Sequence, residues 1–310
     1  MGSPDATVAQ ALKSEPKFLK PVSRTPAGAK AKGFYDLVRP ELPAAAGICV
    51  VAGELLGLGR LPSAGELVLG FLAGFFVSGS EMVFNDYFDV DVDRVNRPER
   101  PLPSNRVTPN EAMAFASVLS AAGFVASALL SAASLALIAA VWVVGLLYNW
   151  RFKEAGLLGN LMVSFSVAMT FVFGGVGVAG LANGVVLVFG ASAFVFDLSE
   201  EISSGIMDAA GDEKRSVRSL ARVKGRAFAM RVSGLLLVLF VALTLVPYLA
   251  GWLGLAYIAM VTVVDLAVAV IGLSLVRSDT TEEGRMRIRQ LYITLTLFVV
   301  ALIVSKFLFL

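Results

Sequence analysis

The chain has 310 residues, of which 57% are hydrophobic and 16% are charged. Soluble domains are usually about 45–50% apolar and about 25% charged, so this composition excludes an ordinary soluble protein and indicates a membrane protein. The formal net charge of +2 gives no reason to expect nucleic-acid binding. Histidine is absent and Cys49 is the single cysteine, which excludes histidine catalysis, disulfide frameworks and the usual zinc sites.

The first 32 residues are polar, contain several prolines and lack the continuous apolar core of a signal peptide. We expect residues 1–32 to form a flexible cytoplasmic tail and residues 33–310 to form one transmembrane domain. A membrane-spanning helix needs about 20 mostly apolar residues, and the sequence contains nine such stretches. They are Tyr35–Leu58, Gly65–Phe84, Asn110–Leu130, Ala132–Asn149, Leu157–Leu181, Gly184–Ile206, Gly225–Leu249, Trp252–Val276 and Leu291–Leu310. The expected fold class is an all-α, polytopic bundle of nine helices, with a tight hairpin at Ser131–Ser134.

Basic residues are distributed unevenly among the loops of this bundle. Lysine and arginine gather in the N-terminal tail and in the connections after the second, fourth, sixth and eighth helices. The opposite side has only Arg60, with Lys306 near the C-terminus. Because positively charged loops stay in the cytoplasm, this pattern predicts a cytoplasmic N-terminus in a multi-pass protein of the cell membrane.

A cluster of acids follows the second apolar stretch. Asp86, Asp89 and Asp93 are spaced so that a continuous helix would place them on one face, with Asn85 at its edge. Like charges so close together are unfavourable unless a cation binds between them. Oxygen ligands favour Mg²⁺, which takes one or two carboxylates together with waters and substrate phosphate oxygens. We therefore expect a Mg²⁺ site here.

A second acidic cluster follows the sixth helix. On a continuous helix, Glu201, Asp208 and Asp212 would share one face. Two carboxylate clusters on the same side of the membrane suit a substrate that carries a diphosphate, because Mg²⁺ would bridge the carboxylates to the phosphates. Basic side chains would complete the grip on the diphosphate. The candidates are Arg97, Lys153, Lys214 and Arg218.

At these residues the chain resembles the UbiA superfamily of intramembrane prenyltransferases. The family's Asn-Asp-x-x-Asp-x-x-x-Asp motif matches Asn85, Asp86, Asp89 and Asp93, and its Asn-Arg-Pro-x-Arg-Pro-x-Pro-Ser pattern matches residues 96–104. The shorter Asp-x-x-x-Asp motif matches Asp208 and Asp212. The resemblance implies that both motifs hold Mg²⁺ and a prenyl diphosphate at the cytoplasmic side. It also implies substrate contacts by Arg39, in an Arg-Pro pair, and by the segment containing Tyr148 and Lys153.

Within the superfamily, the chain is most similar to the archaeal digeranylgeranylglyceryl phosphate synthases. The resemblance implies transfer of a geranylgeranyl group to geranylgeranylglyceryl phosphate in ether-lipid synthesis, with membrane lipids around the site. The branch usually has Arg-Glu-Ile-x-Lys-Asp before the second motif, whereas residues 200–205 read Glu-Glu-Ile-Ser-Ser-Gly. Prenylation of an aromatic quinone precursor, such as 4-hydroxybenzoate, therefore stays open as an alternative.

The acceptor must lose a proton when it attacks the prenyl group. With no histidine available, a carboxylate is the expected base, and Asp86 and Glu201 are the candidates. A different class of function, an ion-coupled secondary transporter, would also use membrane acids. Transporter sites usually lie near the bilayer midplane, whereas these acids lie at predicted helix ends, which favours the enzyme.

Overall fold

The computed structural model describes residues 26–208 and 218–309. Every regular element in this part of the chain is a helix, and the bundle of nine long helices is confirmed there. The long helices are α3 (Glu41–Leu58), α4 (Ala64–Phe88), α6 (Pro109–Leu130), α7 (Ala132–Leu147), α8 (Leu157–Ala179), α9 (Gly184–Asp208), α11 (Arg226–Leu249), α12 (Leu255–Val276) and α13 (Thr281–Phe309). The short elements are α2 (Ala27–Val38), α5 (Val90–Asn96), α10 (Leu220–Lys224) and the π-helical segment η1 (Tyr148–Phe152).

Eight of the nine long helices have the length and hydropathy needed to cross a membrane, with α7 and the following η1 counted together as one span of 21 residues. The remaining one, α9, has 25 residues and carries Asp197, Glu200 and Glu201 in its second half. Helices satisfy all their backbone hydrogen bonds internally, which is the condition for crossing lipid. The chain is therefore a multi-pass integral membrane protein.

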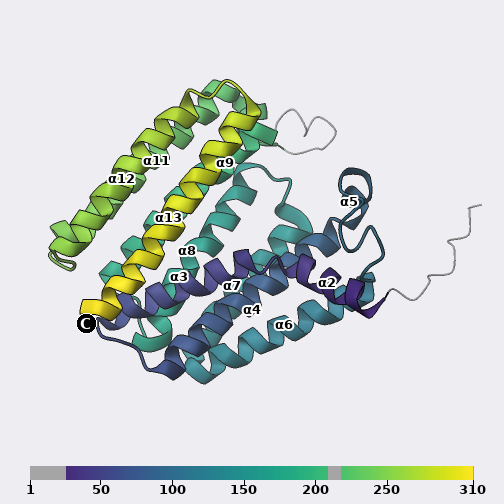
Figure 1. Ribbon diagram of the computed structural model, residues 1–310, viewed down its shortest axis with the longest axis horizontal. Coiled ribbons are helices and arrows are strands. Elements are labelled where there is room, and N and C mark those ends of the chain that lie inside the picture. The colour runs from purple at the N-terminus through teal and green to yellow at the C-terminus, as the bar shows by residue number, and fades with distance from the viewer. Residues whose placement is uncertain (1–25, 209–217, 310) are drawn as a thin grey trace, which may run out of the picture.

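The helices are arranged around a central group. Figure 1 shows α11, α12 and α13 on one side of the bundle and α4, α6 and α7 on the other. Between them, α3 packs against α4 and α8, α8 packs against α9, and α9 packs against α11. The α4–α5 junction and the start of α13 lie at one end of the bundle, and the α11–α12 turn lies at the other (Figure 1).

Side chains that cap helix ends define several boundaries. The Ser63 hydroxyl accepts a hydrogen bond from the Glu66 backbone N–H, and the Glu66 carboxylate accepts one from the Ser63 backbone N–H, so α4 starts with a capping box. Thr108 and Glu111 form the same arrangement at the start of α6. The extended residue Ser131 ends α6 and caps α7, which confirms the predicted tight hairpin.

Two predicted boundaries were wrong. The first apolar stretch is not one helix from Tyr35, because the chain breaks at Arg39, which adopts a left-handed conformation with φ of 48°. Pro40 follows it, and a residue before proline is disfavoured in the right-handed helical region. The last helix begins at Thr281, ten residues before Leu291. Its charged first turns extend beyond the apolar stretch on which the prediction was based.

The expected boundary between tail and membrane domain at residue 32 falls inside α2, so residues 27–32 are helical. The packing of α2 ties this segment to the bundle: the Cβ position of Gly33 lies against Val107, and Lys30 forms an ion pair with Glu111 of α6. The described part of the predicted tail is therefore attached to the membrane domain.

Glycines let the backbones of α3 and α8 touch. A Cβ atom added to Gly57 would lie 2.7 Å from the Cα atom of Gly175. One added to Gly174 would lie 2.8 Å from the backbone nitrogen of Glu54 and in contact with the carbonyl oxygen of Val50. Small residues at helix crossings allow such close contact in membranes. The glycines of α8 therefore pack directly against the backbone of α3.

We expect Gly174→Ala to destabilise the protein by about 1–3 kcal/mol, because the new methyl group would push α3 and α8 apart. The measurement is thermal unfolding in detergent. Gly177→Ala in the same helix is the matched control, since its Cβ would meet Leu130 and Ser134 at 3.5 Å, an ordinary contact. Equal unfolding temperatures for the two variants would contradict the backbone contact.

Candidate active site

The acidic segment at the end of α4 is interrupted at Asp89. This residue lies between α4 and α5 with φ of −88° and ψ of −1°. Helical hydrogen bonds nevertheless cross the junction, from the Asp89 backbone N–H to the Asn85 carbonyl at 3.1 Å and from Asp93 to Asp89 at 2.8 Å. The helix is thus interrupted at Asp89, but hydrogen bonds of the helical i→i−4 type connect α4 to α5 through Asp93.

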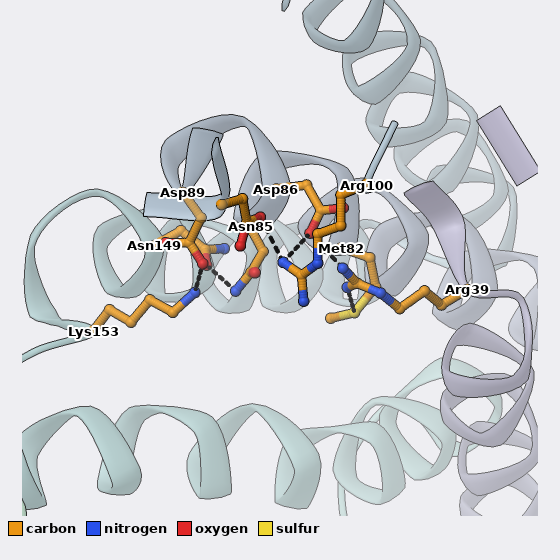
Figure 2. Close-up of polar contacts among 9 residues, drawn as sticks. Arg39, Met82, Asn85, Asp86, Asp89, Arg100, Asn149 and Lys153 are labelled. Atoms are coloured by element: carbon orange, nitrogen blue, oxygen red, sulfur yellow. Dashed lines mark hydrogen bonds and ion pairs between the residues drawn. The ribbon is translucent and has the colours of Figure 1, made fainter. Parts of the chain in front are cut away.

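Asp86 and Asp93 share one arginine. The Arg100 guanidinium lies 2.6 Å from an Asp93 oxygen and 3.3 Å from Asp86, and Arg39 also forms an ion pair with Asp86 (Figure 2). Both carboxylates are almost completely buried, with side-chain exposures of 2% for Asp86 and 3% for Asp93. Asp86 Oδ2 has no hydrogen-bond partner within the described residues. The two arginines thus hold the first motif from the side of α2 and of the loop after α5.

Burial alone would lower the pKa of the Arg100 guanidinium. The hydrogen bond to Asp93 and the negative charges of Asp86, Asp93 and Asp89 outweigh that effect, and the pKa is raised overall. Arg100 therefore keeps its positive charge throughout the physiological pH range.

Asp89 points to a different cation. Its carboxylate lies 2.5 Å from the Lys153 ammonium, which follows η1 at the end of α7 (Figure 2). The Asn85 side-chain amide donates to the Asn149 side-chain oxygen at 3.0 Å, so a second polar contact joins α4 to η1. The π-helical turn is closed by a hydrogen bond from Lys153 to the Tyr148 carbonyl at 2.9 Å. Such turns often occur at functional sites.

The structure describes only some of the acidic residues at and after the end of α9. Glu201 lies within range of the charges of Asp197, Asp208 and Lys153, which links α9 to the Lys153–Asp89 pair. Asp208 is half exposed and pairs with Arg285 of α13 at 2.7 Å. The predicted ligand Asp212 and the predicted phosphate contact Lys214 lie outside the described residues.

Two other predicted basic residues lie at the edge of this region. Arg97 ends α5, is exposed and donates its backbone N–H to the Asp93 carbonyl at 2.8 Å. The Arg218 backbone N–H donates to the Glu154 carbonyl at 3.3 Å, which brings the start of the α10 region against the loop before α8. Arg97 therefore lies at the end of α5 and Arg218 near the loop after η1, and among the described residues neither side chain contacts the buried carboxylates.

A cavity of about 300 Å³ opens beside these groups. Its polar end is formed by Asn85, Tyr148, Asn149 and Glu201. The rest of the wall is mainly apolar and comes from α3, α4, α7 and α8, with residues such as Val50, Val77, Ile138, Val163 and Phe173. The arrangement can hold an amphiphilic molecule with its charged head at the ion pairs and its chain between the helices.

The donor atoms around this cavity fit Mg²⁺. No group of three acidic side chains is close enough to hold a metal ion unaided among the described residues. Mg²⁺ does not need three, because it commonly keeps waters and takes substrate phosphate oxygens with one or two carboxylates. The oxygen donors of Asn85, Asp89 and Asp93, together with the unpaired oxygen of Asp86, provide such ligands.

Sequence reasoning missed Arg100 and Asn149. Arg100 belongs to the same arginine–proline pattern as Arg97, which we expected to contact the diphosphate. The pattern does not show which of the two arginines reaches the carboxylates. Asn149 lies beside Tyr148 in the segment that was noted. Only the fold shows which of two neighbouring side chains faces the carboxylates.

Comparisons with known proteins identify the family of the chain. The model of the UbiA prenyltransferase family matches residues 46–305. A digeranylgeranylglyceryl phosphate synthase from Methanopyrus kandleri is 35% identical over 229 residues, which cover 74% of this chain and 83% of that protein.

Solved structures share the fold. One described as digeranylgeranylglyceryl phosphate synthase in membranes has a TM-score of 0.74 and 27% identity, and covers 89% of this chain and 98% of that chain. A UbiA homologue from Archaeoglobus fulgidus, bound to GPP and Mg²⁺, has a TM-score of 0.68 and 18% identity, and covers 88% of this chain and 99% of that one. The family match makes the protein an enzyme rather than a transporter. The chain belongs to the UbiA prenyltransferase family.

Proposed function

We propose that the chain transfers a geranylgeranyl group from geranylgeranyl diphosphate to the hydroxyl of geranylgeranylglyceryl phosphate, in a Mg²⁺-dependent reaction. The observation that carries the proposal is the set of ion pairs at the open end of an apolar cavity between α4, α7 and α8. The relatives that are named for this reaction, at 35% identity in the example above, support the choice of acceptor.

The residues at the cavity end would bind the diphosphate. Lys153, Arg39 and Arg100 already pair with carboxylates, and phosphate oxygens are equivalent partners for the same cations. Asn85, Asp89, Asp93, Asp208 and Asp212 are the residues that would hold Mg²⁺. When bound, Mg²⁺ neutralises the charge that develops on the leaving diphosphate.

The apolar wall would protect the reacting carbon. As the bond between the prenyl C1 atom and the diphosphate oxygen breaks, positive charge develops on the allyl group. The lipid-facing helices exclude water that would otherwise capture this cation. The acceptor oxygen then bonds to C1, and Glu201, which lines the cavity, is our candidate to take the hydroxyl proton.

Asp86 is a poor candidate for that base. It is buried between the guanidinium groups of Arg39 and Arg100, and both of them contact the same carboxylate oxygen, Oδ1. We assign it instead the role of holding both arginines in place for the diphosphate. Tyr148 lines the cavity beside Glu201 and would contact the substrate there.

The acceptor can be tested directly. Purified protein is given geranylgeranyl diphosphate with geranylgeranylglyceryl phosphate and 4-hydroxybenzoate in competition, with Mg²⁺ or with EDTA. We expect the ether product by mass spectrometry, and its loss with EDTA, because the diphosphate leaves poorly without the cation. A prenylated aromatic product would instead support the quinone-precursor alternative.

We expect Asp89→Asn to lower kcat by about 100-fold or more, because the neutral amide neither balances Lys153 nor binds a cation as a carboxylate does. Initial rates in detergent measure this. Asp91→Asn is the matched control: Asp91 belongs to the same acidic segment, but its side chain is 85% exposed and pairs with Arg94 at the surface. Similar rates for the two variants would remove Asp89 from the site.

The active site is proposed to face the cytoplasm. The end of the bundle that carries the ion pairs also carries Arg94, Arg97 and Arg106 after α4, and the charged first turns of α13. Basic segments near membrane helices stay on the cytoplasmic side. The opposite end, at the α11–α12 turn, has no such cluster within its described residues.

The orientation predicts which face of a vesicle exposes each end. In a Cys49→Ala background, Val95→Cys on α5 and Ala250→Cys after α11 both place an exposed thiol outside the cavity. A membrane-impermeant maleimide should label Val95→Cys in inside-out vesicles and Ala250→Cys in right-side-out vesicles. The reverse pattern would place the site on the outer face.

A further inference from the structure

Glu81 lies on α4, four residues before Asn85, within the membrane-spanning part of the helix. Its side chain lines the cavity. Glu81 Oε1 is buried and has no hydrogen-bond partner among the described residues, and no lysine or arginine described by the structure forms an ion pair with this carboxyl. A carboxyl group left without a partner inside a membrane is costly, so its presence calls for a functional explanation.

The fold leaves space for this carboxyl between α4 and α7. A Cβ atom added to Gly145 of α7 would lie 3.0 Å from Glu81 Oε2 and would touch Glu81 Oε1. Gly145 also lines the cavity. The absence of a side chain at Gly145 is therefore what allows the Glu81 carboxyl to occupy its position in the wall.

Two other polar side chains in the inner wall already donate a hydrogen bond to their own helix. The Ser166 hydroxyl donates to the Met162 carbonyl at 3.1 Å, and Thr170 donates to the Val167 carbonyl at 2.7 Å. At the mouth, the Asn85 amide is bonded to Asn149. Glu81 is thus set apart as a hydrogen-bond acceptor that faces the cavity with unmet capacity.

We propose that the Glu81 carboxyl accepts a hydrogen bond from the attacking hydroxyl of the acceptor and orients it toward the prenyl C1 atom. In this arrangement Glu81, rather than Glu201, is the first group to receive the hydroxyl proton as the new C–O bond forms. This inference rests on the proposed function, in which the acceptor carries a hydroxyl. The prenyl diphosphate has no group that would bind the Glu81 carboxyl. Its diphosphate is negatively charged and would bind the cations at the mouth, and its isoprenoid chain has no hydrogen-bond donor.

The position of Glu81 along α4 suits this role. Four helical residues correspond to about 6 Å along the helix axis, so the carboxyl lies that far inside the membrane from Asn85 at the cavity mouth. The first carbons of a prenyl chain whose diphosphate is held at the mouth would occupy the same depth. A hydroxyl held at this depth would already lie beside the prenyl C1 atom, so less entropy would be lost when the two groups react.

The test is a cycle of protein and acceptor changes. Wild type, Glu81→Leu and Glu81→Gln are first assayed for activity with geranylgeranylglyceryl phosphate as the acceptor. Their affinity for this lipid is then measured by thermal shift. The same measurement is made with the O-methyl ether of the lipid, which lacks the free hydroxyl. Removing one hydrogen-bond partner should weaken acceptor binding by about tenfold. We expect this loss in Glu81→Leu, with the KM for the donor unchanged, and partial recovery in Glu81→Gln.

The acceptor hydroxyl should increase the affinity for the acceptor only when the Glu81 carboxyl is present. Wild type is expected to bind the free alcohol better than the ether, whereas Glu81→Leu should bind the two equally. Asp91→Asn, at an exposed position outside the cavity, is the control and should behave as wild type. Gly145→Ala should reproduce the acceptor defect, because its methyl group would displace the carboxyl.

The outcomes separate this inference from the proposed function. A donor-induced thermal shift in Glu81→Leu shows that the variant is folded. If wild type forms the ether product and Glu81→Leu keeps its discrimination between alcohol and ether, the role of Glu81 is overturned while the function stands. If wild type neither binds nor uses the alcohol, both are overturned.

Discussion

The burial of Asp86 between two arginines is the interaction on which the site depends. Arg39 reaches it from the break between α2 and α3, and Arg100 reaches it from the loop after α5. Removing one partner of a buried ion pair typically costs about 3–5 kcal/mol, because a charge is left uncompensated. These two ion pairs therefore fix two separate segments, the break between α2 and α3 and the loop after α5, against the end of α4. The left-handed conformation of Arg39 fits the same purpose, since it turns α2 away from α3.

Close packing of α3 against α8 is the second feature that shapes the site. The glycines that bring α3 against α8 also fix the spacing of the cavity wall, since Val50 lies at that crossing and lines the cavity with Phe173. In lipid there is no hydrophobic force to press helices together, so contact between their surfaces has to provide the stability. The cavity is therefore a gap left by specific packing, with a width set by backbone contacts and a polar end set by ion pairs.

The sequence was sufficient for the helices and the first acidic motif, and insufficient for the partners of each side chain. Apolar length and charge asymmetry are local signals, so the spans were predictable within a few residues, except where Pro40 and the charged start of α13 altered the ends. Which arginine reaches a carboxylate depends on how the loop after α5 folds back, and sequence spacing does not encode that. Glu81 gave no signal because its meaning comes from the missing side chain of Gly145 on another helix.

Charge balance explains why the donor and the cation should bind together. At the mouth, the carboxylates of Asp86, Asp89 and Asp93 are matched by the cations of Arg39, Arg100 and Lys153. A diphosphate arriving alone would add negative charge to a neutral, largely buried cluster, and a divalent cation alone would add positive charge. Either excess is costly where water is scarce. Arriving together, they nearly cancel, and each lysine or arginine can exchange a carboxylate for a phosphate oxygen while the carboxylate turns to the metal ion. In the proposed reaction, the donor diphosphate and its cation would together replace the partners that these acids and bases have in each other.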